Sequence, residues 1–94
     1  MSATRSVHVR ISGRVQGVSF RVWTERRANA LGLAGWVRNQ RDGAVEAVFS
    51  GPSDAVDAML AACRNGPRLA RVERVEVLGD VEPVPGRFTI RSDR

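Results

Sequence analysis

The sequence predicts an α+β fold in which two helices cover one face of an antiparallel sheet. Several short segments alternate apolar and polar residues, which is the period of a strand with one buried face. Two other segments place apolar residues at steps of three and four, which is the period of a helix that buries one side. These segments follow one another as strand, helix, strand, strand, helix and strand, with a short fifth strand at the end.

The first strand and the first helix flank a glycine-containing loop. Val7, Val9 and Ile11 alternate with polar residues and predict a strand. From about Ser19 the period becomes helical, and Gly32 stands where a left-handed residue would end the helix. The buried side expected for this helix consists of Phe20, Trp23, Thr24, Ala28 and Leu31.

A hairpin follows the first helix. The pattern predicts a second strand over residues 33–39 and a third over residues 44–50. Asp42 and Gly43 lie between them, and an Asp-Gly pair favours a tight hairpin turn.

The remaining half predicts a second helix and two more strands. Ser53 or Asp54, after a Gly-Pro break, is available as the helix N-cap, and residues 65–67 end the helix. The valines of the fourth strand are spaced unevenly, which predicts a β-bulge, and residues 88–90 form a short closing strand. The apolar residues are Val56, Met59, Leu60 and Cys63 in the helix, and Val72, Val75 and Val77 in the fourth strand.

This order of elements matches the ferredoxin-like split βαβ plan, βαββαβ with a short C-terminal strand. Two helices with apolar sides need one face of the sheet to bury them, which leaves the other face wetter. Because the chain has 94 residues and no evident linker, we expect a single domain over residues 1–94.

The composition, 43% hydrophobic and 27% charged, is typical of a globular protein. No apolar run approaches the ~20 residues that span a bilayer, and no stretch resembles a signal peptide. A single cysteine, Cys63, fits a reducing compartment, and a single histidine, His8, argues against a site built from several histidine ligands. We therefore expect a cytoplasmic protein with no membrane partner and no metal.

The net charge of +5, from arginines without any lysine, favours anionic partners such as nucleic acid or small phosphates. The RNA-recognition module shares the predicted fold, but it stacks bases on aromatic residues of its central strands. No aromatic platform is expected here, so RNA binding is disfavoured. The outer faces of the first and third strands would present Ser6, His8, Arg10, Ser12, Ala44, Glu46 and Val48.

Residues 13–21 have the features of a phosphate-binding loop. Gly13 and Gly17 permit a turn whose N–H groups point inward as an anion nest. The helix that begins next adds unpaired N–H groups and the positive end of its dipole. Arg21 can form two parallel hydrogen bonds with a phosphate. The loop lacks the Lys-Ser/Thr of a nucleotide-binding P-loop, so ATP is not expected.

Residues 13–21, Gly-Arg-Val-Gln-Gly-Val-Ser-Phe-Arg, resemble the signature of the acylphosphatase family, Gly-x-Val-Gln-Gly-Val-x-Phe-Arg. Gly-Trp-Val-Arg-Asn at residues 35–39, followed by residues 42–46, resembles the second signature of that family. The resemblance covers nearly the whole chain, because it continues through residues 31–33, 70–72 and 88–91.

The resemblance implies hydrolysis of the carboxyl–phosphate bond of small acyl phosphates to a carboxylate and inorganic phosphate, without a metal or an organic cofactor. The phosphate-binding arginine of the family matches Arg21 and its water-orienting asparagine matches Asn39, so these two residues are expected to be catalytic. The matched phosphate-binding positions are Val15, Gln16, Gly17, Val18, Ser19, Phe20 and Arg21.

The residue types suit this reaction. The leaving group is a carboxylate whose acid has a pKa of roughly 4, so no general acid is needed. Phosphoryl transfer needs mainly positioning, which Asn39 can provide for a water, and charge stabilisation, which Arg21 and the loop N–H groups can provide. No strong general base is evident, and a phosphate oxygen of the substrate is the hypothetical proton acceptor. His8 lies in a strand at an unknown distance from the loop.

Two other functions stay open on the sequence. One is a non-catalytic regulatory module that binds phosphate or carbamoyl phosphate, and the other, less favoured, is an RNA-binding domain. For the enzyme, we expect a monomer whose partner is a small acyl phosphate and not nucleic acid. Outside the site, His8 is expected to be an exposed strand residue and Cys63 a core residue. Trp23 and Trp36 are expected to serve packing.

Overall fold

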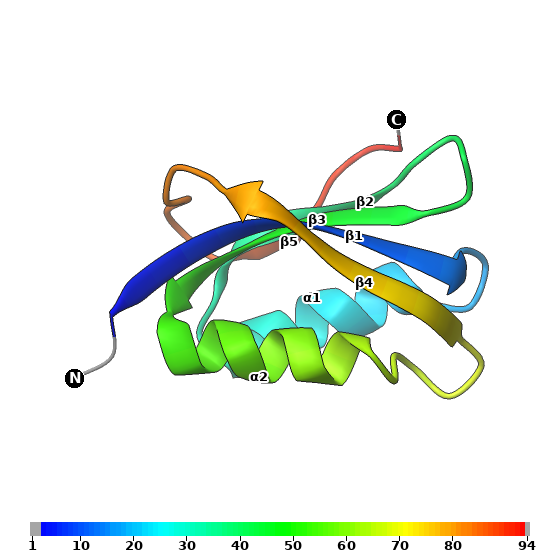
Figure 1. Cartoon of the computed structure of the whole chain (residues 1–94), viewed down its shortest axis with the longest axis horizontal. Coiled ribbons are helices and arrows are strands. Elements are labelled where there is room, and N and C mark those ends of the chain that lie inside the picture. Colours follow the sequence, from blue (N-terminus) through cyan, green and yellow to red (C-terminus); the bar gives the residue numbers. More distant parts are fainter. Residues whose placement is uncertain (1–2, 94) are drawn as a thin grey trace.

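The structure, a computed structural model that describes residues 3–93, contains one five-stranded sheet and two helices. Both helices, α1 (Phe20–Ala30) and α2 (Ser53–Cys63), lie on the same face of the sheet (Figure 1). The expected order of elements is confirmed, including the short closing strand. The strands are β1 (Thr4–Arg14), β2 (Ala34–Asn39), β3 (Val45–Pro52), β4 (Arg71–Asp80) and β5 (Phe88–Ile90).

The strand order in the sheet is β4-β1-β3-β2-β5. Four strands pair antiparallel as expected, but β5 pairs parallel to β2, so the expectation of a wholly antiparallel sheet is wrong at this edge. The connection over residues 81–87 reverses the chain after β4 and leads it to the opposite edge. Because β4 and β2 run in opposite directions, a strand reversed relative to β4 must run parallel to β2.

The bulge predicted in the fourth strand is confirmed, and a second one is present. The register between β1 and β4 shifts between Ser12 and Gly13 and again between His8 and Val9. At the first shift a Cβ on Gly13, whose φ is +120°, would lie 2.2 Å from the carbonyl oxygen of Arg71. Only glycine permits this close approach of the two backbones, directly before the loop that follows β1.

Helix α1 ends as the sequence predicts. Gly32 has a φ of 73°, and its N–H donates to the carbonyl of Asn29 at 3.0 Å. The N–H of Leu33 donates to the carbonyl of Ala28 at 2.9 Å, which completes a Schellman motif.

The predicted N-cap of the second helix is wrong. The N-cap is Pro52, not Ser53 or Asp54, and no side chain caps the helix. Strand β3 continues to Pro52, and the N–H of Ser53 donates to the carbonyl of Ala3 at 2.7 Å. The chain therefore passes from strand to helix without the turn in which a capping side chain would lie.

The core lies between the sheet and the helices, and the predicted apolar stripes form it. Phe20, Thr24 and Ala28 of α1 are buried, whereas Trp23 and Leu31 lie at the margin of the core. In α2, Val56, Met59 and Cys63 are buried and Leu60 is at the margin. Burial raises the pKa of the Cys63 thiol to about 12, so this thiol is not a nucleophile at neutral pH.

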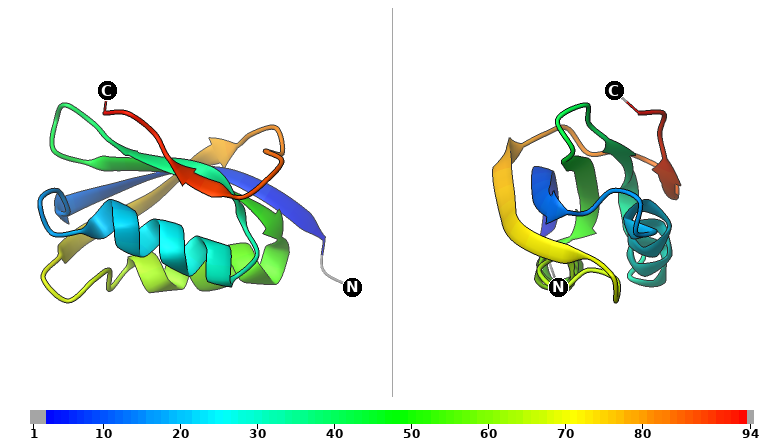
Figure 2. Two further views of the ribbon diagram at one scale, coloured as in Figure 1. Left: turned by 180° about the vertical axis from the view of Figure 1, so that it is seen from behind. Right: turned by 90° about the vertical axis from the view of Figure 1, so that its right-hand side faces the viewer.

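The loop between β1 and α1 and the hairpin between β2 and β3 lie at the same end of the molecule (Figure 2). The C-terminal tail after β5 also runs toward this end, whereas β1 begins at the other end. Within residues 3–93, neither helix is long and apolar enough to cross a membrane.

Candidate active site

The loop between β1 and α1 is shaped by two left-handed residues. Gly17 has a φ of 73° and Ser19 a φ of 63°, and Ser19 is the one non-glycine residue with a positive φ within residues 3–93. Left-handed residues in a turn direct successive N–H groups into one concavity. Ser19 is the N-cap of α1, but its side chain makes no capping hydrogen bond and the first turn holds no acidic residue. The beginning of α1 is therefore suited to an anion.

A cleft of about 430 Å³ opens beside this loop. It brings together Arg21 from the first turn of α1 and Asn39 from the end of β2, which are 18 positions apart in the sequence. The structure thus places the two expected catalytic residues around one space. The residues lining the cleft are Val15, Gly17, Ser19, Phe20, Arg21, Val22, Asn39 and Ile90.

Asn39 carries an unsatisfied polar atom at this cleft. It follows Val37 on the helix-covered side of β2 and is only 9% exposed. Its Oδ1 is buried without a hydrogen-bond partner, the one such side-chain atom within residues 3–93. Buried acceptors are nearly always paired in folded proteins, so an unpaired acceptor on a residue that lines the cleft is unusual.

Arg21 is held at the mouth of the cleft by a carboxylate. Its Nη1 donates to Oδ1 of Asp93, in the C-terminal tail, at 2.9 Å. Both side chains are partly open to solvent. A guanidinium that binds a carboxylate at this position can bind a phosphate oxygen in the same way.

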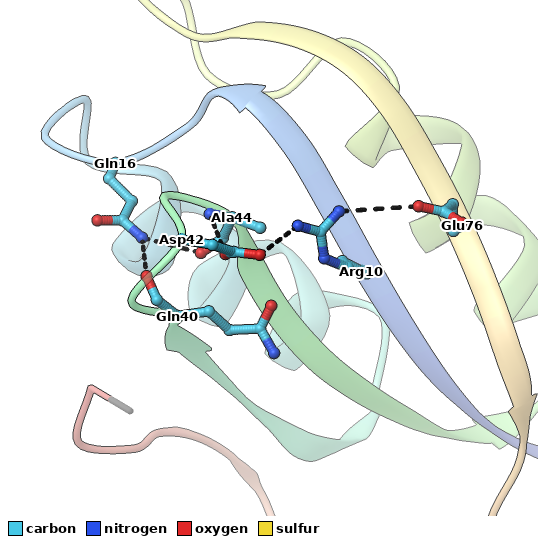
Figure 3. Close-up of polar contacts among 6 residues, drawn as sticks. All are labelled: Arg10, Gln16, Gln40, Asp42, Ala44 and Glu76. Carbon is cyan, nitrogen blue, oxygen red and sulfur yellow. Dashed lines mark hydrogen bonds and ion pairs between the residues drawn. The ribbon is translucent and has the colours of Figure 1, made fainter.

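Gln16 does not line the cleft, and its side chain connects the loop to the hairpin instead (Figure 3). Its Nε2 donates to the carbonyl oxygens of Gln40, at 2.7 Å, and Ala44, at 2.9 Å. Val18 is not among the lining residues either, and its side chain packs in the core, which leaves the prediction about its main-chain N–H untested. Of the seven predicted phosphate-binding residues, five therefore line the cleft and these two do not.

The tip of the hairpin is braced from the side of the sheet. Asp42 accepts from the N–H of Ala44 at 3.0 Å through Oδ1 and from Nη2 of Arg10 through Oδ2 (Figure 3). The hydrogen bond from Arg10 is the main cause that lowers the pKa of the Asp42 carboxyl, and the bond from the N–H of Ala44 lowers it further. Arg10 also lies 3.8 Å from Oε1 of Glu76 in β4, so the brace reaches from the hairpin turn to the edge strand.

Three residues at this end of the molecule were not predicted from the sequence. Val22 and Ile90 line the cleft and are 42% and 37% exposed, and Asp93 pairs with Arg21. An exposed valine next to Arg21 was a visible signal, because it interrupts the polar side of the helix. Ile90 belongs to the expected closing strand, but its place beside the loop depends on the parallel pairing of β5 with β2.

His8 lies on the open face of the sheet and is half-buried, not exposed as expected. It alternates with the core residues Val7 and Val9, so it points away from the helix-covered side on which the cleft lies. Its Nε2 contacts Oε2 of Glu46, and Nε of Arg38 donates to Oε1 of Glu46 at 2.6 Å. Burial raises the pKa of Glu46, but the bonds from Arg38 and His8 outweigh it and hold that pKa below its usual range.

The open face carries one aromatic residue that the sequence analysis did not place there. Trp36 of β2 pairs with Val48 on this face, whereas the expectation of no aromatic platform considered only the first and third strands. The guanidinium carbons of Arg38 and Arg91 lie 4.6 and 4.7 Å from the centre of its ring. The indole is 9% exposed, so it packs as expected and presents little ring surface for a base.

The sequence and fold were compared with known proteins. The family model for acylphosphatase matches residues 7–90. An acylphosphatase of Azorhizobium caulinodans is 52% identical over 90 residues, which are 95% of this chain and 97% of that protein. An acylphosphatase of Nitrobacter hamburgensis is 68% identical over 66 residues, 70% of this chain and 67% of that protein.

The fold is also similar to that of a solved acylphosphatase. The solved structure of an acylphosphatase from Coxiella burnetii superposes with a TM-score of 0.87 at 34% identity and covers 94% of this chain and 93% of that chain. The family match runs through both segments that build the cleft, the loop after β1 and the end of β2. With its fold and its sequence both matched over nearly their whole length, the chain belongs to the acylphosphatase family, whose enzymes hydrolyse acyl phosphates.

Proposed function

We propose that this acylphosphatase holds the phosphoryl group of a small acyl phosphate in the loop of residues 15–21 and directs a water at phosphorus with Asn39. The observation that carries the proposal is the unpaired, buried Oδ1 of Asn39 in the same cleft as Arg21. An acceptor without a partner can orient a water by accepting one of its protons in a hydrogen bond.

Phosphate binding in this proposal uses main-chain and side-chain donors together. The main-chain N–H groups of residues 15–20 surround the phosphoryl oxygens, and Arg21 exchanges Asp93 for two of those oxygens. The left-handed Gly17 and Ser19 and the uncapped start of α1 support this assignment. Donors fixed before the substrate arrives stabilise the charge of the transition state without rearranging.

The proposed step is attack of the water oxygen on phosphorus, with cleavage of the bond between phosphorus and the carboxyl oxygen. The bonding electrons leave with the carboxylate, and the proton of the water passes to a phosphoryl oxygen. Arg21 is the one titratable residue among those lining the cleft, and His8 lies on the opposite side of the sheet. Substrate-assisted proton transfer is therefore the route that these residues favour.

We also propose that the acyl group lies against Val22 and Ile90, the two exposed apolar residues of the cleft. The enzyme would act as a single domain over residues 1–94 and as a monomer, without a metal and without binding nucleic acid. A cytoplasmic location suits its single cysteine, Cys63.

The test is hydrolysis of benzoyl and acetyl phosphate in ¹⁸O-labelled water with a chelator present. We expect both substrates to release phosphate, with the label in the phosphate and none in the carboxylate. Benzoyl phosphate should show the higher kcat/KM if its ring packs against the apolar wall. Label in the benzoate would place the attack on the carbonyl carbon and contradict the role of Asn39. Binding of phosphate without any turnover would favour the regulatory module instead.

A further inference from the structure

We propose that the side chain of Gln16 is a positioning residue that sets the distance between the phosphate-binding loop and Asn39. This inference rests on the proposed function, because it concerns the two parts of the same site. The loop would hold the phosphoryl group and the hairpin would hold the water-orienting side chain, and these parts come from separate segments of the chain. The side chain of Gln16 joins them through hydrogen bonds to the hairpin.

The two bonds of Gln16 fall next to Asn39. Nε2 donates to the carbonyls of Gln40 and Ala44, and the N–H of Gln40 donates to the carbonyl of Ala44 at 2.8 Å. Asn39 precedes Gln40 directly and pairs with Val45 in the last register position of β2 and β3. The amide of Gln16 therefore grips the hairpin at the main-chain position adjoining Asn39.

The loop end of this connection is the better fixed of the two. Val15, Val18 and Phe20 are buried on both sides of Gln16 along the chain and anchor the loop in the core. The hairpin tip, residues 41–43, is exposed, and the bond that braces it, from Arg10 to Asp42, involves neither Gln40 nor Asn39. Loss of the Gln16 amide would therefore release the hairpin, and Asn39 with it, more than the phosphate-binding loop.

The contact between residue 16 and the hairpin requires an amide side chain. Both hairpin partners are carbonyl oxygens, so the side chain at position 16 must supply two N–H groups and no negative charge. An ionised glutamate has the same size but offers only acceptors, whereas a protonated glutamate can donate one hydrogen bond. The state of a glutamate at this position would therefore switch the connection with pH.

The first measurement compares Gln16→Ala with the wild type. We expect kcat for benzoyl phosphate to fall roughly tenfold, the order expected for the loss of two neutral hydrogen bonds. The inhibition constant of inorganic phosphate should change by less than about twofold, because Arg21 and the loop amides stay in place. An unchanged kcat, or an inhibition constant that weakens as much as kcat falls, would overturn the inference.

The second measurement compares Gln16→Glu with Gln40→Glu over a range of pH. These are the two glutamines of the chain, and the side chain of Gln40 points away from Gln16 (Figure 3). Both variants place a carboxylate near Arg41 and Asp93, which line a small pocket with Gln16 and Gln40. We expect kcat of Gln16→Glu to be low at pH 7 and to recover severalfold toward pH 5, relative to the wild type. Equal recovery in Gln40→Glu would mean a general charge effect and would overturn the inference.

A readout without turnover separates this inference from the proposed function. In Gln16→Ala, exchange of the Gln40 N–H with solvent should accelerate, because its acceptor, the carbonyl of Ala44, is no longer fixed by Gln16. Exchange in the helices should not change. A wild type that hydrolyses no acyl phosphate would contradict the proposed function alone. Unchanged exchange at Gln40 would contradict the role of Gln16 whatever the activity.

Discussion

Two buried polar residues on opposite sides of the sheet, Glu46 and Asn39, differ in how their side chains are paired. On the open face, Glu46 accepts a hydrogen bond from Arg38 at Oε1 and contacts His8 through Oε2, so both carboxylate oxygens are used. On the helix-covered side, Asn39 is equally buried but leaves Oδ1 unpaired, and α1 begins without a side-chain cap. A buried polar atom without a partner costs about 1–3 kcal/mol, so such atoms are rare in folded proteins.

The same contrast applies to the arginines and the asparagines of this chain. Some hydrogen-bond to partners within the fold, whereas others lie at the cleft. Charge alone does not distinguish them, because arginines lie on both sides of the sheet. The partners distinguish them: Arg38 bonds a buried carboxylate that it stabilises, whereas Arg21 bonds an exposed carboxylate that a substrate can replace. Variants at matched residues should therefore divide into losses of activity and losses of stability.

The largest effect is expected for Arg21→Ala compared with Arg38→Ala. Two charge-assisted hydrogen bonds contribute about 3–6 kcal/mol together, so Arg21→Ala should lower kcat/KM by roughly two to four orders of magnitude with little change in Tm. Arg38→Ala should lower the free energy of unfolding by about 2 kcal/mol, because Glu46 loses a partner, and should keep kcat. Steady-state kinetics and thermal melting measure both. Equal loss of activity in the two variants would contradict the expectation that Arg21 serves activity and Arg38 serves stability.

The second-largest effect is expected for Asn39→Ala compared with Asn29→Ala. Asn39→Ala should lower kcat about a hundredfold, as expected for a misplaced nucleophile, without lowering Tm, because its unpaired Oδ1 stabilises nothing in the free enzyme. The amide of Asn29 is fully used: Oδ1 accepts from the N–H of Phe88 at 3.0 Å and Nδ2 donates to its carbonyl at 3.2 Å. Asn29→Ala should therefore lower Tm by several degrees. A lower Tm in Asn39→Ala would mean that its amide is structural.

A smaller effect, on Tm, is expected when a change of pH alters the ionisation of Glu46. Its folded pKa lies below the unfolded value of about 4.3, so its ionised form stabilises the fold above that pH, and this stabilisation is lost as pH falls through the folded pKa. The Tm of the wild type should exceed that of Glu46→Gln at pH 7, and the two should converge as pH falls through the folded pKa of Glu46. A difference in Tm that is constant with pH would assign the effect to packing.

Much of this architecture follows from local sequence. Gly32 ends α1 because a left-handed residue is needed there, and the slip in spacing between Val72 and Val75 marks a bulge. The parallel pairing of β5 and the missing N-cap of α2 were not predictable in the same way. Both depend on which distant segments meet, β5 beside β2 and the N–H of Ser53 against Ala3, and a local pattern does not encode this.

The residues of the site also divide into those that a local motif identifies and those that only the tertiary structure brings together. Arg21 and Asn39 belong to short motifs, so the sequence located them before the structure placed them around one cleft. Gln16 was predicted to bind phosphate through its main-chain amide, and no role was predicted for its side chain. The partners of that side chain are main-chain carbonyls, which carry no signal of residue type. Ile90 and Asp93 reach the site through the course of the C-terminal tail, which only the tertiary structure fixes.

The smallest effect is expected for Asp93→Asn. Its ion pair with Arg21 has side chains 37% and 62% exposed, and pairs of this kind contribute only about 0–1 kcal/mol. In the proposed function a phosphate displaces this carboxylate, so its removal should lower the inhibition constant of inorganic phosphate by about twofold, with kcat unchanged. The gain should shrink as salt is raised, since salt screens the same pair in the wild type. Weaker phosphate binding in Asp93→Asn would show instead that Asp93 holds Arg21 in the binding position, so that the carboxylate supports the site.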